Sequence, residues 1–170
     1  RLYPEVLRTS SPDITGADDA VQGVPNDGVT TGGGDNGWPE GEHPALAIDD
    51  DTSTKFLHFK GETEPTGIQI TPLAGATVVT GITFTTANDA PERDPVSFEL
   101  YGSNASIDGP YTLIASGDIV DFTQADPWPR FTKNTTPITF DNDVAYAHYQ
   151  VLVPTVVLGV DACRLDDRGD

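Results

Sequence analysis

The sequence predicts an all-β fold, an antiparallel sandwich or barrel, and two observations carry this prediction. Short runs that alternate apolar and polar residues recur from Gly67 onward, and turn-forming clusters separate them. No stretch of about 12 residues or more shows a helical period. Strands that follow one another without intervening helices pair antiparallel and close into a sandwich or a barrel.

The expected strands can be read in chain order. They are residues 67–71, 76–86, 96–102, 111–115, 137–140 and 146–153. In the longest of them, Val78, Ile82 and Phe84 share one face, and threonines occupy the other. The clusters expected as turns are 87–94, 104–110 and 141–143.

The N-terminal part differs in composition from the rest of the chain. Residues 1–43 are dominated by Gly, Asp, Asn, Pro, Ser and Thr, and the glycines at 32–34 cannot propagate a helix or a strand. We therefore expect residues 1–43 to be an irregular arm that packs on or extends from the domain, with short strands only near Leu2 or Val21. Residues 44–170 are expected to form the sandwich.

The composition excludes several classes of partner. The chain has 170 residues, enough for one domain, and its 9 basic and 27 acidic residues give a net charge of −18. Such a chain does not bind nucleic acid or an anionic membrane by general electrostatics, whereas it attracts divalent cations. No apolar run is long enough to span a membrane. Cys163 is the single cysteine, so no internal disulfide forms.

An acidic stretch, Asp49-Asp50-Asp51, lies between two apolar segments and is followed by Thr54. Three adjacent carboxylates repel one another, so a fold that packs them needs a cation or a well-solvated loop. A short loop with only oxygen ligands suits calcium. The spacing is not that of an EF-hand, and a solvated acidic turn between two strands is the alternative interpretation.

The search for catalytic motifs is mostly negative. His43, His58 and His148 have no zinc-site spacing, and no nucleophile elbow is present. Carboxylates are so abundant that a close pair arises by accident, without implying a glycosidase. We therefore expect no enzyme activity. Asn104 and Asn134 begin N-glycosylation sequons, which also arise often by chance.

Two further features leave alternatives open. Arg93 lies among acids in the loop 86–95, where it either pairs with Asp89 or Asp94 and braces the loop, or reaches out to the hydroxyls of a ligand. Trp38 follows the glycine-rich run, and it either fills the edge of a core or stands exposed as a stacking surface.

Three blocks of the sequence resemble discoidin-like domains, the group that includes the coagulation factor 5/8 C-terminal type and the family 32 carbohydrate-binding modules. The acidic segment 47–56 is similar to the Ala-Ile-Asp-Gly-Asp-x-x-Thr-x-Trp/Tyr signature. Residues 93–104 and 111–117 resemble the next two blocks in order. The resemblance covers about residues 40–153 and is closest to the variety found in secreted or surface proteins of environmental bacteria.

The resemblance implies a jelly-roll β-sandwich with a structural Ca²⁺ ion. Carried over residue by residue, its ligands are the Leu46 carbonyl and the side chains of Asp49, Asp51 and Thr54. Asp50 replaces the usual glycine, and it would strain the turn if a positive φ is required. The family's final glutamate ligand has no counterpart, because the tail 160–170 departs from the pattern.

The resulting functional hypothesis is a non-catalytic, calcium-stabilised module, secreted or at the cell surface, that binds a glycan. Sugars need an aromatic face and polar side chains, and the candidates are Trp38, Asn88, Arg93 and Trp128. The alternative is a structural or adhesive protein that assembles with copies of itself, its N-terminal arm serving in strand exchange. A third interpretation, an accessory domain of a larger hydrolase, is compatible with the first.

Overall fold

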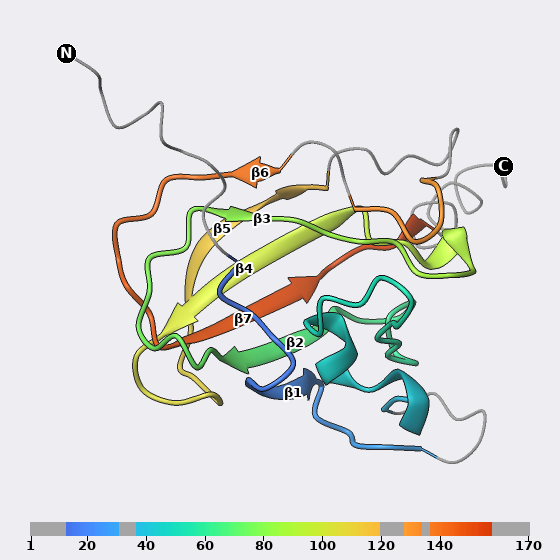
Figure 1. Cartoon of the computed structure of the whole chain (residues 1–170), viewed down its shortest axis with the longest axis horizontal. Helices are drawn as coiled ribbons and strands as arrows, with labels where there is room; N and C mark the ends of the chain where they lie inside the picture. Colours follow the sequence, from blue (N-terminus) through green and yellow to red (C-terminus); the bar gives the residue numbers. More distant parts are fainter. Residues whose placement is uncertain (1–12, 31–36, 120–127, 134–136, 158–170) are drawn as a thin grey trace, which may run out of the picture.

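Two antiparallel β-layers make up the part of the chain that this computed structural model describes, residues 13–30, 37–119, 128–133 and 137–157. The larger layer has the strand order β1-β2-β7-β4-β5, and the smaller layer contains β3 and β6 (Figure 1). The strands are β1 Ala20–Val24, β2 Thr66–Thr71, β3 Gly81–Ile82, β4 Ser97–Ser103, β5 Thr112–Asp118, β6 Ile138–Thr139 and β7 His148–Val153. Three short 3-10 turns join them: η2 Glu40–Glu42, η3 Pro44–Ala47 and η4 Pro91–Arg93. The predicted all-β sandwich is confirmed.

Strand β7 is the central strand of the larger sheet. Val151 pairs with Ile68 of β2 on one side and with Leu100 of β4 on the other, so three apolar side chains meet on the inner face. The outer face is polar: the side-chain amide of Gln22 donates to Gln69 at 2.6 Å, and Gln69 donates to Gln150 at 2.7 Å. The alternation in the sequence thus decides which side chains enter the core.

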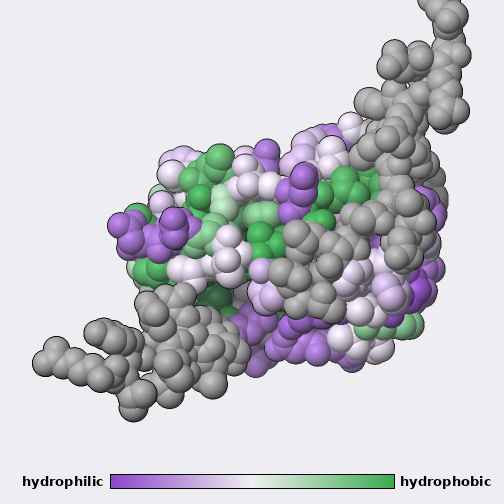
Figure 2. Space-filling view, turned by 90° about the horizontal axis from the view of Figure 1, so that it is seen from above, coloured by the Kyte–Doolittle hydropathy of each residue, from purple (hydrophilic) through white to green (hydrophobic). Residues whose placement is uncertain are grey.

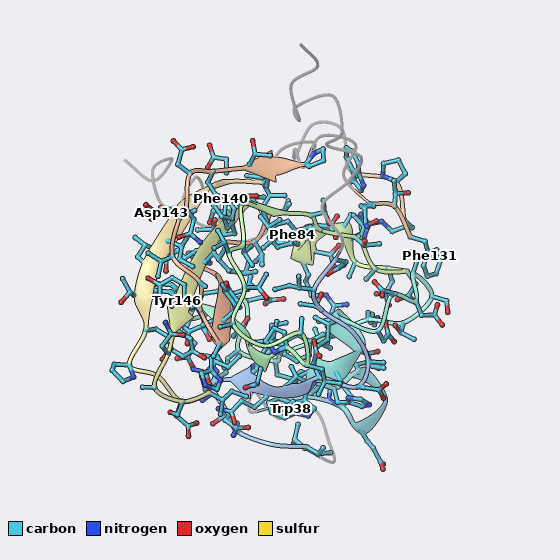
Figure 3. All side chains as sticks on the ribbon, turned by 60° about the vertical axis from the view of Figure 1, so that its left-hand side comes forward. Trp38, Phe84, Phe131, Phe140, Asp143 and Tyr146 are labelled. Carbon is cyan, nitrogen blue, oxygen red and sulfur yellow. The ribbon has the colours of Figure 1, made fainter. Side chains whose placement is uncertain are left out.

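In the smaller layer, backbone pairing extends beyond the two short strands β3 and β6. Isolated bridges pair Thr77 with Tyr146 and Thr85 with Lys133, on either side of the β3–β6 pair. Residues 77–85 therefore run antiparallel to Lys133 and to residues 138–146, although only Gly81–Ile82 of the predicted strand 76–86 is regular. Phe84 points between the layers, where its ring lies 5.9 Å from that of Phe98 (Figure 3).

The N-terminal residues contribute a strand, so the expected boundary at residue 44 has to be corrected. Strand β1, which contains Val21, pairs antiparallel with β2 and forms one edge of the larger sheet. On its inner face, Gly23 lies directly under the ring of Trp38: a Cβ atom at Gly23 would be 2.3 Å from Cζ3 of that ring. Trp38 also makes edge contacts with Phe56 and His58. Described residues before 44 are therefore part of the domain.

The core is divided into two clusters of buried side chains. One contains Phe98, Leu100, Ile119 and Tyr149, and the other contains Ile48, Ile68 and Ile70. Val151 packs against both clusters, so it connects the two halves of the sandwich.

The outer surface over the smaller layer mixes apolar and polar residues (Figure 2). Val78 and Val144, at the β7-proximal end of this layer, are both partly exposed. Scattered exposure of this kind is ordinary on protein surfaces. Among the described residues, no helix has the length and apolar content needed to cross a bilayer.

The contact between Gly23 and Trp38 gives a test of the N-terminal packing. Gly23→Ala should destabilise the domain by about 1–3 kcal/mol, because the added methyl group forces the Trp38 ring to move. At roughly 2–4 °C per kcal/mol, thermal unfolding should shift down by several degrees. Gly41→Ala is the control, since a Cβ there meets nothing within 4 Å. Equal melting temperatures for the two variants would contradict the packing described here.

Candidate functional site

Three loops gather at one end of the sandwich, beyond the C-terminal end of β7 (Figure 1). They are the acidic loop 48–59, the loop 86–95 that contains η4, and the loop 128–133. Lys55 of the first loop reaches Asp89 of the second at 2.7 Å, and the Phe131 amide of the third donates to the Ala87 carbonyl at 3.2 Å. This end contains all the residues for which the sequence predicted a metal-binding role.

The Thr54 hydroxyl is the centre of the acidic loop. Its oxygen lies 2.8 Å from Oδ2 of Asp49, 2.9 Å from the Asp51 carbonyl and 3.5 Å from the Leu46 carbonyl. Turn η3 supplies the Leu46 carbonyl, and the following turn folds Thr54 back onto it. Four oxygen atoms from the four predicted calcium ligands are thus brought together.

The three oxygens around the Thr54 hydroxyl are all hydrogen-bond acceptors, and the hydroxyl carries a single proton. A hydroxyl group donates one hydrogen bond, so Thr54 cannot donate to Asp49 and to both carbonyls at once. A cation among such oxygens would replace the missing protons, and carboxylate, carbonyl and hydroxyl oxygens are the donors that a hard cation prefers. The donor set therefore fits calcium.

Asp51 enters this group through its main chain, which differs from the side-chain role expected for it. Its Oδ1 accepts hydrogen bonds from the Ser53 hydroxyl at 2.6 Å and the Ser53 amide at 2.8 Å. These two bonds hold the pKa of the Asp51 carboxyl below its usual range, the hydroxyl contributing most. Within the described ranges, no three His, Cys, Asp or Glu side chains are grouped to hold a metal, so carbonyls must supply part of any shell.

Asp50, which stands where the resembled signature has glycine, adopts the positive φ angle that was expected to strain the turn. Its φ angle is 59°, in the left-handed region that glycine adopts without cost. The backbone N–H of the next residue, Asp51, donates to Asp49 Oδ1 at 3.0 Å, and this hydrogen bond closes a sharp turn around Asp50. The loop therefore keeps the shape of a glycine turn although it carries a third carboxylate.

The bracing arginine of the second loop is Arg130, not Arg93. The guanidinium of Arg130 binds both oxygens of the buried Asp94 carboxylate, and it also donates to the Asp89 carbonyl at 3.2 Å and the Trp128 carbonyl at 2.7 Å. The bond to Asp94 raises the pKa of Arg130 further. Arg130 therefore fastens loop 128–133 to loop 86–95, and Arg93 makes no side-chain hydrogen bond or ion pair with the described part of the chain.

Phe131 supplies an exposed aromatic ring on the braced loop. Its side chain is 46% exposed, and it lies at the outer edge of the molecule (Figure 3). Its φ angle of 55° is unusual for a phenylalanine, and strained residues of this kind gather at functional sites. Asn88, also exposed, follows Ala87, to which Phe131 is hydrogen-bonded. An aromatic face and polar side chains thus occur on adjoining loops.

A cavity of about 830 Å³ extends from these loops into the sandwich. Its inner part is apolar and includes Ile68, Ile70 and Val151, whereas Arg93 and Lys133 are among the charged residues that line it. Of the four candidates for sugar contacts, Arg93 lines this cavity, and Asn88, Trp38 and Trp128 do not.

Neither tryptophan presents a free stacking face. Trp38 is 6% exposed and belongs to the core, which replaces its assignment to a ligand surface. The Trp128 indole is half-buried, donates to the Thr132 carbonyl at 2.9 Å and packs against the Phe98 cluster. It supports the loop on which Phe131 stands.

Some predicted features cannot be placed. Residues 160–170, where the last calcium ligand was sought, and Asn134 lie outside the described residues. Asn104 is described, and its side chain is used in the fold: it donates to the Ala145 carbonyl at 3.0 Å and accepts from the Ala147 amide at 2.9 Å.

Comparison with known proteins finds relatives only at the level of structure. No family model matches the chain, and no curated protein matches it. Among solved structures, the family 32 CBM from C. perfringens NanJ in complex with galactose matches with a TM-score of 0.57 and 17% identity, over 86% of this chain and 89% of that chain.

A second structure, CpGH89CBM32-5 from Clostridium perfringens in complex with GalNAc-β-1,3-galactose, gives a TM-score of 0.59 at 16% identity, over 86% of this chain and 91% of its own. A third, CBM32-1 from a family 31 glycoside hydrolase of Clostridium perfringens, gives 0.53 at 14% identity, over 86% and 89%. The chain therefore has the discoidin-like β-sandwich fold that is found in family 32 carbohydrate-binding modules.

Proposed function

We propose that this chain is a non-catalytic carbohydrate-binding module that acts outside the cytoplasm and is stabilised by calcium. The observation that carries the proposal is the exposed ring of Phe131, which lies on a loop braced by Arg130 beside Asn88. The structural neighbours that contain galactose or GalNAc-β-1,3-galactose share this fold and support the choice of ligand class. The acidity and the predicted calcium loop support an extracellular setting.

The proposed sugar site differs in its aromatic residue from the one expected from sequence. Phe131 provides the stacking face, Asn88 and Arg93 bind hydroxyl groups, and Trp128 holds the loop from below. An apolar ring face set among a few polar side chains is the usual composition of a small-ligand site.

Replacement of Phe131 tests this site. Phe131→Asn should weaken binding of galactose-terminated oligosaccharides at least about tenfold, because an aromatic face buried by a ligand contributes roughly 1.5–3 kcal/mol. Its melting temperature should not fall, since asparagine tolerates the positive φ at this position. Isothermal titration and thermal unfolding measure the two effects.

Leu113→Asn is the matched control for Phe131→Asn. Leu113 has a similar exposure of 52%, but it stands on β5, outside the three loops. Unchanged sugar binding in Phe131→Asn, or an equal loss in both variants, would show that the ring of Phe131 is not the stacking surface.

The calcium ion is proposed to bind the oxygens of Leu46, Asp49, Asp51 and Thr54. Asp49 and Thr54 contribute side-chain oxygens, and Leu46 and Asp51 contribute carbonyls. The ion would offset the repulsion between adjacent carboxylates and fix the acidic loop against η3. Its role is structural, so it takes no part in a reaction.

Calcium should raise the melting temperature of the purified domain. An ion that binds only the folded state stabilises by about 2.7 kcal/mol at a hundredfold excess over Kd. This corresponds to a shift of roughly 5–10 °C at about 2–4 °C per kcal/mol. Magnesium should give a smaller shift, because it requires a stricter octahedral shell. Thermal unfolding in EDTA and in excess calcium measures the difference.

Two charge-matched variants locate the ion. Asp49→Asn should remove most of the calcium shift, whereas Asp51→Asn should keep most of it, because the Asp51 carboxylate is bound to Ser53 and its carbonyl is unchanged. Asp50→Gly should keep the shift and relieve the strain at φ 59°. Identical unfolding curves with and without calcium would mean that the acidic loop is a solvated turn.

A further inference from the structure

The outer face of the larger sheet carries a row of side chains that crosses four strands. Gln22 of β1 is in register with Gln69 of β2, which is in register with Gln150 of β7. On the other side of β7, Gln150 is in register with Tyr101 of β4. Residues in register on paired strands point to the same face, so these side chains form one line, called here the Gln–Tyr row. None of its residues belongs to the three loops of the candidate site.

The hydrogen bonds within the row run in one direction. The Asp108 carboxylate only accepts, so the Gln22 amide nitrogen donates to it, at 2.8 Å. The same nitrogen donates to Gln69 at 2.6 Å, and Gln69 donates to Gln150 at 2.7 Å. The amide nitrogen of Gln150 ends the chain: it has no hydrogen-bond partner in the described part of the protein, and it is not buried. A free N–H donor is therefore left at the position next to Tyr101.

Tyr101 supplies an aromatic ring that is held in place. Its hydroxyl donates to the Glu99 carboxylate at 2.6 Å, from two residues further along the same strand face. This hydrogen bond raises the pKa of Tyr101, since loss of the proton would set two anions beside each other. The ring is half-buried, so part of it remains open to a ligand. A ring face beside a free amide donor is a combination that suits a sugar.

The face across β1, β2 and β7 carries no formal charge, although the whole chain has a net charge of −18. Its outward positions are Ala20, Gln22, Val24, Gly67, Gln69, Thr71, His148, Gln150 and Leu152. None of them is Asp, Glu, Lys or Arg. An apolar partner would leave the amides of this face without hydrogen bonds, at a cost in free energy. The face therefore matches an uncharged ligand that is rich in hydroxyl groups.

The spacing of the Gln–Tyr row indicates the shape of that ligand. Neighbouring strands lie about 4.8 Å apart, so the row presents one side chain at each such interval. One sugar unit of an extended β-1,4-linked chain advances by a similar length. A chain laid across the strands would thus place one sugar over each member of the row.

We infer that the outer face of the larger sheet is a second glycan site, which binds an uncharged, extended polysaccharide chain across β1, β2, β7 and β4. Tyr101 stacks on one sugar ring, and the free amide of Gln150 donates to its hydroxyl groups. The remaining N–H group of Gln69 and the oxygen of Gln22 serve the sugars that follow. The inference goes beyond the proposed function, which places a galactose-type sugar at the loop end.

Ligand length tests the inference on the full chain. Cellobiose, cellotetraose and cellohexaose are neutral, extended chains, and their binding is measured by isothermal titration. Affinity should rise at least about tenfold from cellobiose to cellotetraose and little beyond it, because the row spans four strands. Maltohexaose, whose α-1,4 linkages coil the chain, should bind at least about tenfold more weakly than cellohexaose. β-1,4-linked mannohexaose is measured beside them, because the row fits the shape of the chain rather than one sugar.

Three variants assign the binding to the row. Gln150→Glu keeps the acceptor for Gln69 but removes the free donor, and Tyr101→Thr removes the ring while keeping a strand-forming residue. Each should weaken cellohexaose binding at least about fivefold and leave binding of a galactose-terminated disaccharide unchanged. Tyr101→Phe, which keeps the ring, should retain most of the affinity for cellohexaose. Thermal unfolding checks that the variants are folded, and Gln150→Glu decides if Tyr101→Thr is not.

Val78→Thr is the control for these variants. Val78 is 42% exposed and belongs to the smaller layer, and the change keeps a β-branched side chain. It should leave the binding of all ligands unchanged. A loss of cellohexaose binding in Val78→Thr equal to that in Gln150→Glu would contradict the assignment to the Gln–Tyr row.

The outcomes separate this inference from the proposed function. Equal affinities for cellobiose and cellohexaose, or binding of neither cellohexaose nor mannohexaose, would overturn the second site even if galactose still binds. Cellohexaose binding that is lost in Phe131→Asn but kept in Gln150→Glu would assign the chain to the loop end and also overturn it. A dimer in light scattering that dissociates in Gln150→Glu, without cellohexaose binding, would show that this face pairs with a second copy. Absence of galactose binding with an intact response to chain length would contradict the proposed function alone.

Discussion

The loop end of this domain depends on the ion pair between Asp94 and Arg130. Asp94 is 6% exposed, and a carboxylate at such a depth is tolerated only with a hydrogen-bonded cation. The same residue also joins the segment that follows β7, since its carbonyl accepts the Val157 amide at 3.1 Å. Arg130 in turn places the neighbouring Phe131, and it frees Arg93 from the bracing role. One buried pair therefore fixes the geometry of both candidate ligand residues.

The strands were predictable from sequence because their signal is local. Alternation around Ile68 and Leu100 reports burial directly, and the four longer strands β2, β4, β5 and β7 lie close to the expected ranges. Strand β1 was expected only as a short strand near Val21. The surrounding sequence is polar and rich in glycine, which hides the strand. Gly23 is required because the ring of Trp38, a residue of another segment, lies where its side chain would be.

The candidate site shows the same division between local and long-range information. The four oxygen donors of the acidic loop lie within nine residues, Leu46 to Thr54, so spacing and resemblance brought them together. The main-chain role of Asp51 depends on the Ser53 hydrogen bonds, which a motif does not encode. Phe131 and Arg130 were missed because their roles depend on contacts with the loop 86–95, about 40 residues away in sequence. Pro129 beside them is only a general turn signal.

The divided core has a consequence for cooperativity. The Ile48–Ile68–Ile70 cluster and the cluster around Phe98 share contacts through the half-buried Val151 and through sheet pairing. Two packing units linked in this way have separate free energies of local opening. Each value is set mainly by the contacts within that half of the sandwich. Strand β1, the acidic loop and the Trp38 contacts all belong to the Ile68 half. Their local stability therefore depends on the packing of the Ile68 half, whereas that of β4 and β5 depends on the cluster around Phe98.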